Sequence, residues 1–232
     1  MSLSSSLVVC HPHLPWFLDA TLMGFDEAAV DALPWKPAFD AMHALEQGAV
    51  ANADEGRRVG HYWLRAPTLA PEVGLARQIT DTLDAVTGFA ESVRSGGILA
   101  EGGERFTDVL HVGIGGSALG PQLLIDALVE PGAGLRLHFL DNTDPDGIER
   151  VLSRLGEALR TTLVIVVSKS GGTPETANGM KLVVQRLRER GLEVGSRMVA
   201  ITGEGSALDR QAVSEGWLRR FPLWDWVGGR TS

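Results

Sequence analysis

The spacing of hydrophobic residues changes character near residue 100. Over the first hundred residues, apolar side chains recur every three or four positions, which is the period of an amphipathic helix. This pattern predicts a short helix over 26–33, a second helix opened by Pro37, and a long third helix from Pro71 to the glycine pair 96–97. The apolar positions of the second and third helices are Phe39, Met42, Leu45 and Val50, and Leu75, Ile79, Leu83, Val86 and Phe89. Between these two helices, residues 60–67 are expected to be a hydrophobic loop without a regular period.

Beyond residue 105, short apolar runs, glycine-rich turns and helical stretches alternate. Short, continuously apolar runs are typical of strands that are buried on both faces. The expected strands are 109–112, 135–140, 163–167 and 198–201, and the expected helices are 118–129, 145–152, 174–190 and one after Ser206. This alternation predicts an α/β fold with a doubly wound, mostly parallel sheet flanked by helices, preceded by a helical N-terminal segment. Ligands of such sheets bind at the carboxyl ends of the strands, so the turns there are the places to look for chemistry.

Composition and charge narrow the class of protein. The 232 residues carry 21 Lys and Arg against 29 Asp and Glu, a formal net charge of −8. An acidic balance argues against a nucleic acid or an anionic membrane as the partner. The single cysteine, Cys10, excludes an internal disulfide and every CxxC motif. No apolar run approaches the ~18 residues of a membrane-spanning helix, and the N-terminus lacks the basic start of a secretory signal. A cytoplasmic location is therefore expected.

The turn after the first of these strands is rich in glycine. It reads GIGGSALG over residues 113–120, and Ser117 is expected to cap the following helix, whose free N–H groups favour an anion. Residues 113–118 satisfy the dinucleotide fingerprint G-x-G-x-x-(G/A), and Asp141 ends the next strand, where a ribose-binding acid belongs. A phosphorylated sugar is the second candidate ligand. A turn that only permits a tight strand-to-helix connection is the third interpretation.

The turn after the third strand favours one of these ligands. It reads SKSGGTPE over residues 168–175 and places three hydroxyls, one ammonium and two glycines before a helix that begins with Pro174. Three hydroxyl donors and free helical amides match the several oxygens of one phosphate. A nicotinamide site needs no second anion cradle of this kind, and the Walker order GxxxxGK[ST] is absent. Phosphate binding is therefore favoured over a solvent-exposed cap.

The remaining polar positions suggest no catalytic group. Residues 202–206 are expected to form a capped turn at the edge of the sheet, and Asp144 is expected to cap the helix that Pro145 opens. No two histidines show metal-ligand spacing with a third partner, so no metal site is predicted. His111, two residues before Gly113, is expected to be a packed strand residue.

The last stretch is dense in aromatic residues. Trp217, Trp224 and Trp226 surround the run 221–223 and are expected to anchor a buried segment. Residues 228–232, GGRTS, differ in character, because a flexible glycine pair followed by an arginine suits another anion-facing turn.

Taken together, these turns resemble the glucose-6-phosphate isomerase family. VGIGGS over 112–117, followed by ALGP, is similar to the family's first sugar-contacting loop, and SKSGGT over 168–173 is similar to its phosphate loop. FPLWDWVGGR over 221–230 resembles its most recognisable segment, and GHYWLR over 60–65 resembles a stretch before the first sugar isomerase (SIS) domain. The four motifs keep the family's order and spacing from about residue 60 to the end.

The resemblance implies a reversible isomerisation of glucose 6-phosphate to fructose 6-phosphate through an enediol intermediate, without a metal or redox cofactor. It also implies three groups of site residues. These are Ser168, Ser170, Thr173 and the backbone of Lys169 for the phosphate, Gly116 and Ser117 for the sugar, and Arg230 as the catalytic residue that stabilises the intermediate. A permanently charged guanidinium beside a developing oxyanion is a strong stabiliser. The resemblance further implies a cytoplasmic enzyme of glycolysis and gluconeogenesis that acts as a homodimer, without a nucleic-acid or membrane partner.

The resemblance also implies a division of the chain. It predicts a helical N-terminal segment over 1–104, a first SIS domain that binds the phosphosugar over 105–223, and over 224–232 the start of a linker into a second SIS domain. The family's catalytic glutamate, ring-opening histidine and late lysine lie downstream of this linker. Because proton transfer between adjacent carbons needs a positioned base, these 232 residues alone are expected to show little or no turnover.

Two departures from the family pattern affect the sugar contacts. Ala118 stands where many members carry aspartate, and Ser170-Gly171-Gly172 replaces a bulkier Thr-Phe-Thr, as in the shorter bacterial branch.

Two other functions stay open at this point. One is a stand-alone SIS-type regulator that senses a phosphosugar. The other is an NAD-dependent oxidoreductase, which rests on residues 113–118 and Asp141 but leaves 168–173 and 228–230 unexplained.

Overall fold

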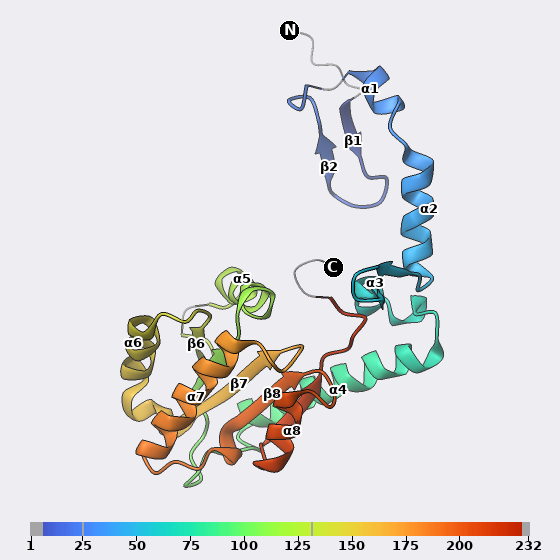
Figure 1. Cartoon of the computed structure of the whole chain (residues 1–232). Coiled ribbons are helices and arrows are strands. Elements are labelled where there is room, and N and C mark those ends of the chain that lie inside the picture. Colours follow the sequence, from blue (N-terminus) through green and yellow to red (C-terminus); the bar gives the residue numbers. More distant parts are fainter. Residues whose placement is uncertain (1–6, 25, 131, 229–232) are drawn as a thin grey trace. The chain divides into compact units, whose positions relative to one another are not determined.

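The computed structural model describes residues 7–24, 26–130 and 132–228, and the chain divides into two compact units, Met1–Ala44 and Leu45–Ser232. The first unit contains an antiparallel hairpin and two helices (Figure 1). These are β1 (Val8–Cys10), β2 (Phe17–Asp19), α1 (Glu27–Asp31) and α2 (Trp35–Glu46), the end of which falls in the second unit. Asp26 caps α1 by accepting from the Ala29 amide, which confirms the short helix predicted there. The hairpin was not predicted, since strands of three residues are too short to show an alternating pattern.

The second unit begins with small elements around a buried tryptophan. They are β3 (Val50–Asn52), β4 (Arg57–Arg58), α3 (His61–Arg65), the 3₁₀ helix η2 (Pro67–Leu69) and the long α4 (Val73–Ser95). Trp63 is fully buried, packs with Ile79 and Trp226, and donates its indole N–H to the Glu46 carbonyl at 2.9 Å. The prediction of an irregular loop over 60–67 is wrong, because a helix of five residues is too short to display a period.

The boundaries of the two longer helices differ from the predicted ones by a few residues. α2 begins at Trp35, two residues before Pro37, and α4 begins at Val73, two residues after Pro71. Proline is tolerated throughout the first helical turn, because the amides of this turn have no acceptor within the helix and the missing N–H of proline costs no hydrogen bond there. A proline therefore marks the start of a helix only approximately. Val50, predicted in the second helix, lies in β3 instead.

A five-stranded parallel sheet forms the centre of the second unit. Its strands are β5 (Asp108–Val112), β6 (Arg136–Leu140), β7 (Thr162–Ser168), β8 (Met198–Thr202) and β9 (Arg219–Pro222), in the order β6-β5-β7-β8-β9. The doubly wound α/β fold is therefore confirmed, with four strands close to their predicted positions. The fifth, β9, was missed because Arg219 and Arg220 interrupt its apolar character. Since β9 pairs with β8, the turn after β8 lies in the interior of the sheet rather than at its edge.

Helices cover both faces of this sheet (Figure 1). The connecting helices are α5 (Leu119–Leu128), α6 (Pro145–Leu155), α7 (Pro174–Glu189) and α8 (Ala207–Ser214), with 3₁₀ turns η3 (Gly115–Ser117), η4 (Gly156–Thr161) and η5 (Gly195–Arg197). The larger core cluster joins alternate strand residues such as Leu110 and Val164 to α6, α7 and α8. The intervening residues, such as Val109 and Leu163, face a second cluster to which α4 contributes Val93.

Local capping chemistry sets the start of two of these helices. The Asp144 carboxylate accepts from the Asp146 and Gly147 amides at the start of α6, and the Ser206 hydroxyl accepts from the Asp209 amide at the start of α8. The Asp144 cap agrees with the prediction, and α8 begins after Ser206 as expected. Within the part of the chain that the structure describes, no helix combines the length and apolar character that crossing a bilayer requires.

Candidate phosphosugar site

The strand order places two turns next to each other at the point where the winding of the sheet reverses. The chain passes from β5 outward to β6, then returns past β5 to continue with β7, β8 and β9. Ligands of open parallel sheets bind at the carboxyl ends of the strands at such a reversal. Residues 113–117 follow β5, and residues 168–173 begin with the last residue of β7. Val112 pairs with Val166 across the two strands. The two turns that the sequence singled out are therefore neighbours.

Three hydroxyl groups converge in the turn after β7. Ser168 is buried and its Oγ lies 2.9 Å from Oγ1 of Thr173, while Ser170 Oγ lies 3.5 Å from the same oxygen. Thr173 occupies the N-cap position of α7 without making a side-chain cap, and Pro174 is the first helical residue, as predicted. Hydroxyl donors, uncapped helical amides and the positive end of a 16-residue helix together favour a phosphate group.

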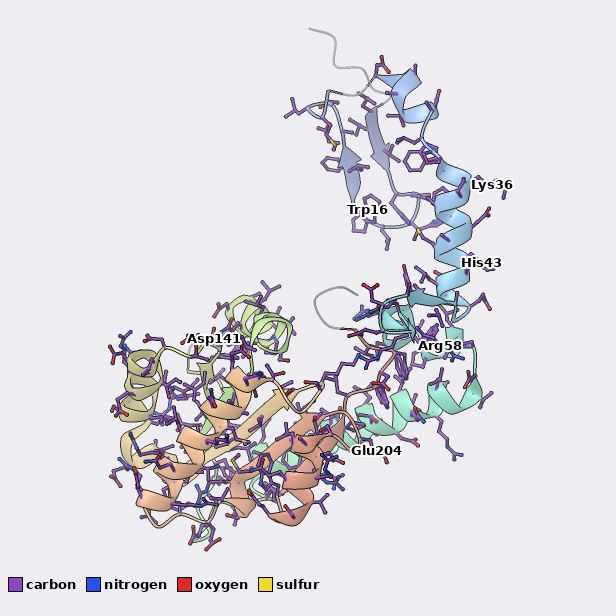
Figure 2. The ribbon with its side chains drawn as sticks, in the orientation of Figure 1. Trp16, Lys36, His43, Arg58, Asp141 and Glu204 are labelled. Carbon is purple, nitrogen blue, oxygen red and sulfur yellow. The ribbon has the colours of Figure 1, made fainter. Side chains whose placement is uncertain are left out.

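The turn after β8 supports the backbone of this hydroxyl-rich turn. Thr202 donates its hydroxyl to the Ser168 carbonyl at 2.6 Å, and the Gly203 amide donates to the Lys169 carbonyl at 3.0 Å. Figure 2 labels Glu204 in this supporting turn. Sequence reasoning assigned this turn only a capping role, because no local signal reveals which strand will lie beside β7.

Lys169 connects the hydroxyl-rich turn to the C-terminal segment. Its ammonium donates to the carbonyls of Asp225 and Val227, with Nζ···O distances of 2.9 and 2.6 Å. Burial lowers the pKa of Lys169 and nearby Arg57 lowers it further, whereas Asp225 and Glu55 raise it. The side chain therefore cross-links the chain to itself, which leaves the backbone of Lys169 as its expected contribution to a phosphate site.

The same C-terminal segment is held on another side by the motif at 60–65. The Gly60 amide donates to the Trp226 carbonyl at 2.8 Å, and the Gly228 amide donates to Nε2 of His61 at 3.2 Å. The ring of Trp226 lies 5.5 Å from that of Trp63, and its side chain is buried as predicted. Lys169 and the motif at 60–65 therefore both hold the segment 225–228.

The turn after β5 presents the two residues proposed to line the sugar. Gly116 is exposed and Ser117 is half-buried, both in the 3₁₀ turn η3. The prediction that Ser117 caps the next helix is wrong, because η3 delays the start of α5 and leaves Ala118 at the N-cap position, with no side-chain cap. His111 is buried in β5, as predicted, and its Nε2 lies 2.7 Å from the Ser117 carbonyl oxygen.

Asp141, the acid on which the dinucleotide alternative depends, already has two partners. It lies at the end of β6 (Figure 2). Its Oδ2 accepts from the side-chain amide of Gln122 in α5 at 2.8 Å, and its Oδ1 accepts from that of Asn142 at 2.9 Å. A ribose diol would have to displace both amide donors to bind this carboxylate.

Some of the sequence-based assignments have no structural counterpart. Arg230, the proposed catalytic residue, lies outside the described residues, and its role stays a prediction. Within 7–24, 26–130 and 132–228, no group of three or more His, Cys, Asp or Glu side chains is placed to hold a metal ion. Cys10 is exposed.

Thr176, in the first turn of α7, has a buried hydroxyl without a hydrogen-bond partner among the described residues, a feature that the sequence did not reveal.

Comparison with known proteins identifies the family of the chain. The phosphoglucose isomerase family profile matches residues 32–232. The glucose-6-phosphate isomerases of Citrifermentans bemidjiense and Synechococcus elongatus are 56% identical over 217 residues and 55% identical over 223 residues. These matches cover 93% and 95% of this chain but 41% and 42% of the relatives, so the chain spans about two fifths of their length.

A solved structure gives the same assignment. The crystal structure of a glucose-6-phosphate isomerase from Chlamydia trachomatis superimposes with a TM-score of 0.74 at 30% sequence identity, covering 89% of this chain and 40% of that one. The profile, the curated relatives and the fold agree with the four motifs and with the adjacent turns described above. The chain belongs to the phosphoglucose isomerase family.

Proposed function

We propose that this chain forms the phosphosugar-binding part of an enzyme that interconverts glucose 6-phosphate and fructose 6-phosphate. The observation that carries the proposal is the adjacency of the hydroxyl-rich turn 168–173 and the glycine-rich turn 113–117 at the reversal of the sheet. One turn offers donors suited to a phosphate and the other an open backbone suited to a sugar. A phosphosugar needs both within the span of one hexose.

In this proposal the phosphate binds at the amino end of α7. The hydroxyls of Ser168, Ser170 and Thr173 and the amide of Lys169 donate to its oxygens, and the helix dipole favours its charge. The hydrogen bond between Ser168 and Thr173 holds the two hydroxyl oxygens close together before the ligand arrives, and the hydroxyl that donates in this bond turns its single hydrogen to the phosphate on binding. Gly116 and Ser117 then contact the sugar.

The reaction itself moves one proton between adjacent carbons. A base removes the proton from C2 of the open-chain aldose, and the C1 carbonyl oxygen takes up a proton as the enediol forms. A proton then returns to C1 while the C2 hydroxyl gives up its proton and becomes the carbonyl. No electrons leave the substrate, so the reaction as proposed balances without a redox cofactor. Arg230 is assigned to stabilise the negative charge of the intermediate. The base is assigned to a part of the enzyme outside these 232 residues.

The division of the chain follows from the same proposal. Residues 1–104 are proposed as an N-terminal segment, 105–223 as the first SIS domain and 224–232 as the start of a linker. A cytoplasmic homodimer without a nucleic-acid partner is proposed for the whole enzyme on the family resemblance and, for nucleic acid, on the acidic composition.

Titration of the chain with inorganic phosphate and with fructose 6-phosphate tests the proposal. Amide NMR should show both compounds shifting residues 168–176, and fructose 6-phosphate should additionally shift residues 114–118. The double variant S168A/T173V should bind each compound at least about tenfold more weakly, because two donors to a charged group are lost. Ser214→Ala, which alters an exposed hydroxyl on α8, serves as the matched control.

Three results would contradict the proposal. Saturable binding of NAD with no response to fructose 6-phosphate would favour the oxidoreductase. Robust isomerisation by residues 1–232 in a coupled assay would show that the base lies within them. Absence of isomerase activity in the longer protein, with phosphosugar binding retained, would favour the regulator.

A further inference from the structure

His111 is a buried titratable residue that the proposed phosphate and sugar contacts do not use. Its side chain is 7% exposed and lies in β5, directly before the glycine-rich turn. The imidazole packs against the ring of Phe139 in β6, with 5.3 Å between ring centroids. An apolar side chain would be enough to fill this buried position, so the reason for a histidine lies in its hydrogen bond.

The hydrogen bond of His111 joins the two ends of the glycine-rich turn. Nε2 lies 2.7 Å from the carbonyl oxygen of Ser117, six residues later. A carbonyl only accepts, so Nε2 carries the hydrogen. Burial lowers the pKa of His111, and the Ser117 carbonyl opposes this only in part. The ring is therefore neutral at pH 7 and takes the Nε2–H tautomer.

The Ser117 carbonyl needs a donor from outside the helix. In a continuing helix it would accept from the amide four residues later, but that residue is Pro121, which has no N–H. The first backbone bond of α5 instead runs from the Gln122 amide to the Ala118 carbonyl at 3.0 Å. The imidazole of His111 supplies the hydrogen that Pro121 cannot.

The turn also rests directly on the imidazole. A Cβ atom at Gly113 would come within 3.1 Å of Ser117 Cβ, and within 3.2 Å of both His111 Nε2 and the Val167 carbonyl. The backbone at Gly113 is thus held between β7 and the ring. Fixing the Ser117 carbonyl fixes the peptide plane between Ser117 and Ala118, and with it the direction in which Gly116 and Ser117 face.

We infer that His111 is a positioning residue that holds the glycine-rich turn in the geometry needed to contact the sugar, through its Nε2–H bond to the Ser117 carbonyl. The inference deepens the proposed function and rests on it for the identity of the ligand. The role of His111 in holding the turn depends only on the geometry of the protein and not on the identity of the ligand. His111 touches neither the phosphate nor the sugar in this assignment.

Two variants of the chain separate the bond from the volume of the ring. His111→Phe keeps an aromatic ring but has no donor, whereas His111→Gln places an amide N–H the same number of bonds from the backbone. Amide hydrogen exchange of residues 114–119, measured without ligand, should accelerate about tenfold in His111→Phe and return toward the original rate in His111→Gln. The Kd for fructose 6-phosphate should rise by about the same factor in His111→Phe, while the Kd for inorganic phosphate should stay unchanged.

Each outcome has a distinct meaning. Unchanged amide exchange in His111→Phe overturns the positioning role. An equal rise in the Kd values for fructose 6-phosphate and inorganic phosphate also overturns it, because this result indicates a general destabilisation of the protein. Faster exchange with an unchanged Kd for fructose 6-phosphate overturns the link to the sugar. If even the unaltered chain binds neither compound, the proposed function fails while the exchange result still judges the positioning role.

A measurement without substitution covers the case in which His111→Phe does not fold. Nitrogen-15 chemical shifts of the imidazole at pH 7 should show Nε2 protonated and Nδ1 unprotonated in the ligand-free chain. The opposite tautomer would overturn the inference, because an unprotonated Nε2 cannot donate to the carbonyl.

Discussion

The ammonium group of Lys169 belongs to a turn suited to phosphate, yet both of its recorded hydrogen bonds go to backbone carbonyls. Those carbonyls belong to Asp225 and Val227, in the segment that the motif at 60–65 also holds. At the scale of one residue, therefore, the presence of a lysine at 169 did not reveal which groups its ammonium contacts. Those groups, two backbone carbonyls, determine the role of the side chain.

Replacing Lys169 by methionine tests this role, because methionine keeps the apolar stem and removes the ammonium. The segment 224–228 should exchange its amides faster, and the fluorescence of Trp224 and Trp226 should shift to the red. The Kd for inorganic phosphate should change less than about threefold, since the backbone amide of residue 169 remains. Lys181→Met, at an exposed position on α7, is the matched control. A loss of phosphate affinity beyond about tenfold would instead assign the ammonium to the ligand.

The turns after β7 and β8 lie side by side at the carboxyl end of the sheet and pack against each other. Gly171 has a φ of +66° and lies so close to the second turn that a methyl group would overlap the Ser206 hydroxyl and approach the Leu208 amide to 2.9 Å. Thr202 and Gly203 donate across the same gap. The close approach of the backbones thus needs glycine at one position, whereas adjacent Gly172 has open space around it.

The variants Gly171→Ala and Gly172→Ala should therefore differ in stability. Gly171→Ala combines an unfavourable φ with a steric overlap and should lower the free energy of unfolding by about 2 kcal/mol or more. It should also weaken phosphate binding, because the turn must move. Gly172→Ala should change stability by less than about 1 kcal/mol. Urea unfolding followed by tryptophan fluorescence measures both, and equal effects would contradict the packing argument.

Across the whole molecule, the two ends of the sheet have different tasks. The candidate site lies at the carboxyl ends of the strands, whereas a charged cluster joins β5 to β6 toward their amino ends. Asp108, which is 1% exposed, accepts from Nε and Nη2 of Arg136 at 2.9 and 2.8 Å and lies 2.8 Å from Nε2 of His138. Burial raises the pKa of Asp108, but the bonds from Arg136, His138 and Thr107 outweigh it and lower the pKa to about 2.

This shift predicts how acid destabilises the fold. The ordinary pKa of 3.8 applies to the unfolded chain. The contribution of ionised Asp108 to the free energy of unfolding is therefore present above pH 3.8 and is lost as the pH falls toward 2. The difference in unfolding free energy between the unaltered chain and Asp108→Asn should shrink by up to about 2 kcal/mol over that interval. Urea titrations at several pH values measure it, with Asp126→Asn on the exposed side of α5 as the control.

The affinity for inorganic phosphate at pH 7 should be unchanged in Asp108→Asn, since the cluster lies at the opposite end of the strands. A pH-independent difference in stability would contradict the ionic origin of the effect.

The sequence by itself determined the features that depend on neighbouring residues. Apolar runs located four of the five strands of the parallel sheet, Asp144 identified a helix cap, and the glycine- and hydroxyl-rich turns identified the candidate phosphosugar site. These features follow from short-range geometry, because a cap, a turn or a buried strand is specified within a few residues. The order of the motifs was enough to indicate the family.

Only the tertiary structure decided which of these local features meet. The reversal between β5 and β7, the pairing of β9, the carbonyl partners of Lys169 and the bond from His111 to Ser117 all depend on strand order and on packing. The two short hairpins and the five-residue helix α3 were not predicted for the same reason, whereas the equally short α1 was predicted. The helix α3 packs its Trp63 side chain against the distant Trp226, and a local pattern carries no information about such a contact.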